Sequence, residues 1–116
     1  MINYSIYSYR TSSGKKIIDE ITLKFDEKSQ LKMREAIRLL KLYGLALLKT
    51  QRVKKIWQNP PIYELRVKGI IEMRLLFSFF KPRLFAIVNI FTKKTNKIPK
   101  KEIDLAIKRI RELNKS

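Results

Sequence analysis

The chain contains no cysteine, no histidine and only three glycines among its 116 residues. The lack of cysteine excludes disulfides and thiolate zinc sites. The lack of histidine removes the commonest general acid/base and metal ligand, so any catalysis must use lysine, arginine, tyrosine, hydroxyl or carboxylate groups. The sequence also has no phosphate-binding glycine loop and no EF-hand-like carboxylate series. We therefore expect neither a metal nor another cofactor.

Acidic residues are scarce: 10 Asp and Glu stand against 27 Lys and Arg, and the formal net charge is +17. Such a charge repels itself and destabilises the compact state, which favours a polyanionic partner. Composition leaves nucleic acid, a membrane surface and an acidic protein open as candidates. The charge is uneven, because residues 1–50 carry 10 basic and 5 acidic side chains (+5) and residues 51–116 carry 17 and 5 (+12). The polyanion site is expected mainly in the second part.

Long apolar runs are also missing, and none approaches the roughly 18 residues that a membrane span requires. The first five residues, MINYS, lack the charged start and apolar middle of a signal peptide. We therefore expect a cytoplasmic protein without membrane association. The length suits one domain covering residues 1–116, and a hydrophobic content of 45% is sufficient for a core.

Hydrophobic periodicity predicts both strands and helices. Alternation of apolar and polar residues, or a short apolar run, predicts strands, and helical spacing predicts helices, one of them ending at Gly44. The strands are expected at residues 2–9, 62–67, 71–80 and 84–92, and the helices at 15–26, 29–43 and from Pro99 onward. Residues 45–61 fit either a helix extension or a loop. The order β-α-α-β-β-β-α predicts an α+β fold in which a small, antiparallel-centred sheet packs on an N-terminal helical hairpin and a C-terminal helix.

Charged residues alternate with apolar ones on two neighbouring predicted strands. Glu64 and Arg66 share one face of the first, and Glu72 and Arg74 share one face of the second. If the strands form a hairpin, the two arginines lie close enough to bind one phosphate, with the glutamates orienting them. An exposed cross-strand ladder of salt bridges without a ligand explains the same spacing.

Lysines and aromatic residues flank these strands. Lys54 and Lys55 precede the hairpin, and Lys93 and Lys94 follow the last strand. Gathered around the arginines, a lysine could act as a general base near neutral pH, although most lysines are solvated surface residues. Aromatic rings in the basic half could stack on the bases of single-stranded RNA or could belong to the core.

Four segments in order carry a resemblance to a known family: VKKI (53–56), YELRV (63–67), EMRLLF (72–77) and FTKKTNKIPKKEI (91–103). Together they resemble the phage-derived branch of HigB-like toxins in the RelE superfamily, over residues 2–114. The resemblance implies a RelE-like fold and the toxin of a type II toxin–antitoxin pair. It also implies ribosome-dependent endonucleolytic cleavage of mRNA, with no cofactor, and a helix-turn-helix (HigA-like) antitoxin as partner.

The resemblance also implies roles for individual residues. A ribose 2′-hydroxyl would attack the adjacent phosphate, whose developing charge arginines would stabilise. The catalytic set expected is Arg66, Arg74, Lys93 and Lys94, and the RNA-binding set is Lys54, Lys55, Tyr63, Glu64, Phe91 and Lys97.

The chain departs from the family pattern at two points. Met73 stands where an aromatic residue is usual, and no histidine or C-terminal tyrosine is present for cleavage. A non-catalytic RNA- or ribosome-binding module of the same fold therefore stays open as an alternative. A basic protein that mainly binds an acidic protein partner is a third.

Overall fold

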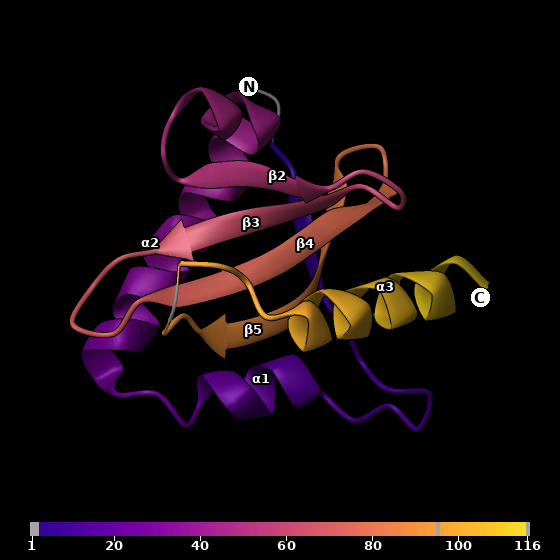
Figure 1. The fold of residues 1–116 in the computed structure, drawn as a ribbon, viewed down its shortest axis with the longest axis horizontal. Coiled ribbons are helices and arrows are strands. Elements are labelled where there is room, and N and C mark those ends of the chain that lie inside the picture. Colours follow the sequence, from indigo (N-terminus) through magenta and orange to yellow (C-terminus); the bar gives the residue numbers. More distant parts are fainter. Residues whose placement is uncertain (1–2, 95, 116) are drawn as a thin grey trace.

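A computed structural model describes residues 3–94 and 96–115 as a five-stranded sheet with helices on both faces (Figure 1). The elements in chain order are β1 (Ser5–Ser8), α1 (Ile17–Thr22), α2 (Glu27–Tyr43), the 3-10 helix η1 (Gly44–Lys49), β2 (Val53–Trp57), β3 (Ile62–Val67), β4 (Met73–Lys81), β5 (Leu84–Thr92) and α3 (Lys100–Lys115). The expected α+β class is confirmed. Within the described residues, no helix is both long and apolar enough to cross a membrane.

The strands lie in the order β1-β5-β4-β3-β2. Strands β2 to β5 form an antiparallel meander, and β1 pairs in parallel with β5. The expected element order is wrong in omitting strand β2. Residues 53–57 belong to the segment 45–61, whose sequence pattern fits a helix extension or a loop. Its apolar residues, Val53, Ile56 and Trp57, are interrupted by two lysines. Lysines are common on edge strands, where they discourage pairing with another chain.

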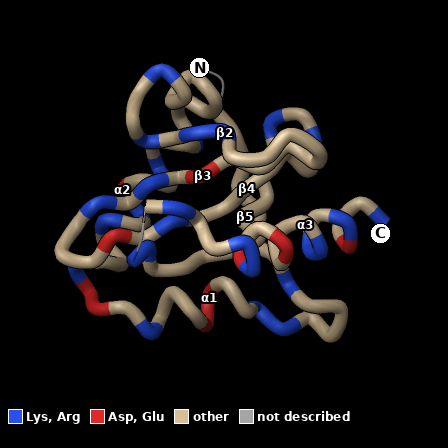
Figure 2. The backbone as a smooth tube through the Cα atoms, viewed as in Figure 1, with Lys and Arg blue, Asp and Glu red and all other residues tan. Residues whose placement is uncertain are grey.

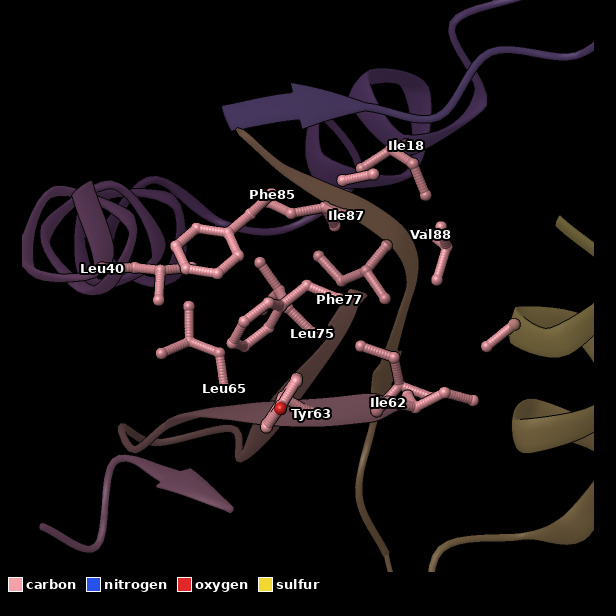
Figure 3. Packing of buried hydrophobic residues seen from close by; sticks show 14 of the residues in the cluster. Ile18, Leu40, Ile62, Tyr63, Leu65, Leu75, Phe77, Phe85, Ile87 and Val88 are labelled. Atoms are coloured by element: carbon pink, nitrogen blue, oxygen red, sulfur yellow. The ribbon is translucent and has the colours of Figure 1, made fainter. Parts of the chain in front are cut away.

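Helices cover the two faces of the sheet differently. Helices α1 and α2 lie on one face, where Leu40 packs among Leu65, Leu75 and Phe85 (Figure 3). Helix α3 lies on the other face, toward which Ile62 points (Figure 3). The expected hairpin of the two N-terminal helices is wrong, because α1 packs mainly on β5 and α2 on β3 and η1. Helix α1 has only six residues, and its buried residue, Ile18, packs against the sheet. It therefore does not pack an apolar face along α2.

The ends of α2 are set by local chemistry. The Asp26 side chain caps the first turn by accepting a hydrogen bond from the Ser29 backbone N at 3.2 Å. Gly44 follows the last helical residue with φ of +55°, a conformation that side chains rarely adopt. A Cβ at this position would also collide with the Tyr4 ring. The expectation that Gly44 ends the helix is confirmed.

A polar cluster connects the residue after β1 with α3. Tyr9 is 5% exposed, and its hydroxyl donates a hydrogen bond to the Glu112 carboxylate. The Arg109 guanidinium lies 4.9 Å from the centre of the Tyr9 ring, and its Nη1 donates to the Val88 carbonyl at 2.8 Å. Burial, followed by the hydrogen bond to Glu112, raises the pKa of Tyr9.

Replacing Tyr9 by Phe tests this cluster. We expect Tyr9→Phe to lower the free energy of unfolding by about 1 kcal/mol at pH 7, because it removes one largely buried hydrogen bond. A raised pKa means that folding favours the protonated phenol. The hydroxyl therefore contributes fully to the free energy of unfolding below the ordinary tyrosine pKa of about 10, and its contribution declines above that pH. In urea unfolding at pH 7 and at pH 11, the difference between wild type and variant should therefore be smaller at pH 11. A constant difference would contradict this assignment.

Candidate nucleic-acid interface

Four charged residues of β3, β4 and the loop between them form a connected network. Arg66 and Arg74 are direct partners across the two strands, so their side chains share the sheet face that α3 covers. Glu64 bridges them: its Oε1 accepts a hydrogen bond from Arg66 Nε at 2.8 Å, and its Oε2 lies 3.3 Å from Arg74 Nε. Glu72 Oε2 lies 3.5 Å from Arg74 Nη2. The orienting role expected of the glutamates agrees with this geometry.

The network is mostly buried, which an exposed salt-bridge ladder would not be. Glu64 is 1% exposed and Arg74 is 4% exposed, whereas the Arg66 side chain is 24% exposed. Arg74 Nη1 donates to the carbonyl of Met73 at 3.1 Å. The two arginines, which are expected to bind one phosphate together, therefore differ in accessibility. Arg66 reaches the surface, and Arg74 lies behind it against Glu64.

A basic cavity of about 360 Å³, here called the lysine cavity, opens beside Arg66. Strands β2 and β3, the connection after β5 and the start of α3 form its walls, and Figure 2 shows Lys and Arg positions on β2, β3 and that connection. The lining residues are Lys54, Lys55, Ile56, Glu64, Arg66, Lys93, Asn96, Lys97, Ile98 and Ile103. Five of these are cationic and one, Glu64, is an anion already engaged by both arginines. The cavity therefore presents net positive charge suited to an anionic ligand.

Six of the ten predicted site residues line this cavity, including three lysines that come from distant parts of the chain. Lys54 belongs to β2, whereas Lys93 and Lys97 belong to the connection before α3. Lys55 also lines the cavity, and its ammonium group lies 5.9 Å from the centre of the Tyr63 ring. Lys94 is exposed but is not among the lining residues.

The two predicted aromatic contacts lie in the interior instead. Tyr63 is 8% exposed and stacks on Phe77 with 5.5 Å between ring centres. Strand alternation places it on the face opposite Glu64, which is the α2 side of the sheet. Phe91 is 9% exposed and is the strand partner of Arg74. Neither ring is offered to solvent as a stacking surface, so the structure corrects both placements.

Sequence reasoning missed the remaining lining residues, which are Ile56, Asn96, Ile98 and Ile103. Asn96 and Ile98 belong to an irregular connection whose path no periodic pattern predicts. Ile56 belongs to the strand that periodicity did not assign. In the described part of the chain, no three carboxylate side chains cluster in a way that could hold a metal ion.

The fold and the cavity define a small, strongly basic α+β protein with a cationic pocket on one face of its sheet. Residues 20–111 match the family described as Phage derived protein Gp49-like (DUF891). The match covers most of the chain, so the protein belongs to this family. The four ordered segments predicted a phage-derived group, and the match confirms the prediction to that extent. The family is associated with the toxins of toxin–antitoxin systems, and this association implies an antitoxin as partner. No curated protein matches the chain.

Replacing the central carboxylate should destabilise the protein. Glu64→Gln removes the buried counter-charge from one buried and one half-buried guanidinium group, and leaves only the exposed Glu72 beside Arg74. Removing one partner of a buried ion pair costs about 3–5 kcal/mol, and we expect a loss of this order in urea unfolding.

Glu72→Gln is the matched control, because Glu72 contacts the same Arg74 but its side chain is 48% exposed. We expect this variant to lose less than about 1 kcal/mol. Equal losses in the two variants would contradict a special role for the buried carboxylate.

Proposed function

We propose that the protein is a RelE/HigB-like toxin of a type II toxin–antitoxin system and that it cleaves mRNA on the ribosome. The observation that carries this proposal is the lysine cavity, where a buried carboxylate holds the Arg66 guanidinium and Lys54, Lys93 and Lys97 line the walls. A pocket of this charge favours a phosphodiester, and family membership favours a toxin that acts in a toxin–antitoxin pair.

The chemistry that suits this pocket is attack by a ribose 2′-oxygen on the adjacent phosphorus. The bond from phosphorus to the 5′-oxygen breaks, and the products are a 2′,3′-cyclic phosphate and a free 5′-hydroxyl. One proton leaves the 2′-hydroxyl and one is delivered to the departing 5′-oxygen, so the reaction needs no further reactant. Negative charge grows on the non-bridging phosphoryl oxygens, and their stabilisation is usually the largest catalytic term.

Arg66 is suited to stabilise that charge. Its Nε is bound to Glu64 at 2.8 Å, which fixes the plane of the guanidinium group. Within the described residues, its two Nη groups make no hydrogen bond or ion pair, so they are available to donate to two phosphoryl oxygens. Arg74 would act as a positioning residue, because its guanidinium contacts Glu64 rather than the cavity.

Lysines would supply proton transfer and charge. The described lining includes no histidine or tyrosine, and its one carboxylate, Glu64, is paired with both arginines, so lysine is the remaining proton carrier. Lys54 and Lys93 approach from different walls and would serve the two proton transfers. Lys97 would neutralise the bound strand. Lys55, whose ammonium group lies near the Tyr63 ring, and the exposed Lys94 would contact RNA outside the cavity.

The partner specific to this proposal is a helix-turn-helix antitoxin of the HigA kind, with which the toxin would associate in the cytoplasm. A net charge of +17 favours rapid association with any acidic partner surface. Binding of the antitoxin over the lysine cavity would block the mRNA.

A non-catalytic RNA- or ribosome-binding protein is the second candidate. It is favoured by the lining that the structure describes, which contains no histidine or tyrosine, and by the burial of Tyr63 and Phe91. Such a protein would bind ribosomes in a salt-dependent manner and leave mRNA intact.

Replacing Arg66 tests the cleavage proposal. We expect Arg66→Ala to lower mRNA cleavage about 100-fold to 1,000-fold, the usual effect of removing one donor to a developing oxyanion. Arg66→Lys keeps the charge but loses the two-pronged donor, so its activity should be intermediate. The measurement is the appearance of new mRNA 5′ ends in a translation reaction assembled from purified ribosomes.

Lys108→Ala, which removes an exposed charge from α3, is the matched control and should retain wild-type cleavage. Thermal unfolding of every variant verifies the fold. Unchanged cleavage in Arg66→Ala would refute the assignment of Arg66. Wild-type protein that binds ribosomes but cuts no message would support the second candidate instead.

A change in the substrate tests whether the ribose 2′-oxygen is the nucleophile. A message with one 2′-deoxyribose at the mapped cleavage position should bind the toxin–ribosome complex as tightly as all-ribose message but remain uncut there. The all-ribose message should yield fragments with 5′-hydroxyl ends, which a kinase labels without prior phosphatase treatment. Cleavage of the deoxy-substituted position would show that water, rather than the 2′-oxygen, attacks phosphorus.

A further inference from the structure

A second basic cavity of about 450 Å³, here called the α2 cavity, lies between α2 and the adjoining ends of β2 and β3. Its lining residues are Lys32, Glu35, Ala36, Thr50, Gln51, Arg52, Arg66, Val67 and Lys68. Four of them are cationic and one is acidic. The cleavage chemistry described above uses only Arg66 from this set.

The single acid in the α2 cavity does not neutralise its cations. Both oxygens of Glu35 are engaged by Arg38, with Arg38 Nη2 donating at 2.6 Å and Nε at 3.0 Å. Arg38 does not line the cavity, so its charge and that of Glu35 cancel at the edge. Lys32 and Lys68 are therefore left as uncompensated positive charge that faces solvent, and the exposed Arg52, whose charge also acts on Glu35, adds a third cation.

Arg66 connects the two cavities. It lines both of them, and its backbone N donates to the Arg52 carbonyl at 2.8 Å, which attaches the start of β2 to β3 at this point. The loop after β3 is held against α2, because the Lys32 side chain passes so close to Gly69 that a Cβ there would lie 2.9 Å from Lys32 Cδ. One polyanion passing over Arg66 would therefore meet both groups of cations.

We propose that the α2 cavity is a phosphate subsite for single-stranded RNA, which binds a backbone phosphate next to the one held in the lysine cavity. This inference rests on the proposed function, because the strand in the α2 cavity is the one that would be cut. The cations line the cavity without an aromatic ring among the described lining residues, so the contact is with the backbone and carries no base preference. The subsite would fix the register of the strand on Arg66.

Binding experiments test the subsite without depending on cleavage. The probes are a dinucleotide and a hexanucleotide of RNA, both with 2′-deoxyribose at the position of attack, measured by calorimetry over a range of salt concentrations. The variant is Lys32→Gln/Lys68→Gln, and the charge-matched control is Lys108→Gln/Lys115→Gln on the exposed side of α3. Thermal unfolding verifies that both double variants fold.

We expect the hexanucleotide to bind Lys32→Gln/Lys68→Gln roughly tenfold more weakly than wild type. The slope of log affinity against log salt should fall by about 0.7, because the variant loses the contact to one single-stranded phosphate. Dinucleotide binding should be unchanged, since one phosphate fills only the lysine cavity. The control variant should match wild type with both probes.

Hexanucleotide binding by Lys32→Gln/Lys68→Gln with wild-type affinity and slope would overturn the subsite. So would a loss of affinity for hexaglutamate without any loss for RNA, which would assign the cavity to an acidic protein segment. These failures are separate from failure of the proposed function, because cleavage is measured with Arg66→Ala on ribosomes. A length-dependent loss of RNA binding in a protein that cuts no message would support the subsite and refute the cleavage.

Discussion

The arrangement of the candidate site depends on one carboxylate, that of Glu64, buried between two guanidinium groups. Taking charges out of water is unfavourable, and apolar residues at such positions often give equal or greater stability. The network is therefore poorly explained by stability alone. Its effect is positional: Glu64 holds Arg66 at 2.8 Å in one orientation, and Arg74 and Glu72 complete the charge balance behind it. Because this network is neutral, the surrounding lysines determine the sign of the cavity.

Much of the fold was predictable because two local sequence features, the alternation of residues in strands and a glycine at a helix end, determine several of its elements. Strand alternation predicted β3 with the bounds that it has, and it placed Arg66 and Arg74 on one face. The glycine at position 44 indicated the end of α2. Strand β2 was not predictable by the same means, because Lys54 and Lys55 stand together at its centre and obscure the alternation. Its strand character depends on pairing with β3, which is a tertiary interaction.

The sequence predicted which face of the sheet the site residues share, but it did not predict how deeply each side chain is buried. Alternation indicates which side chains share a face, but it does not indicate what covers that face. Helix α3 and the connection before it close over the sheet, so Arg74 is buried whereas Arg66 remains accessible. The same limitation applies to Tyr63, whose aromatic ring suits either base stacking or the core. Its position in the strand sequence puts it on the α2 side, where Phe77 packs against it.

The parallel pairing of β1 with β5 has a consequence for how the protein forms during synthesis. Ser5 is aligned with Leu84, and Tyr9 reaches Glu112 across 103 residues of sequence. Strand β1 therefore acquires these neighbours only after residues 84–112 have been translated. For a protein whose proposed target is the translating ribosome, this late closure would delay activity until residues 84–112 have been synthesised.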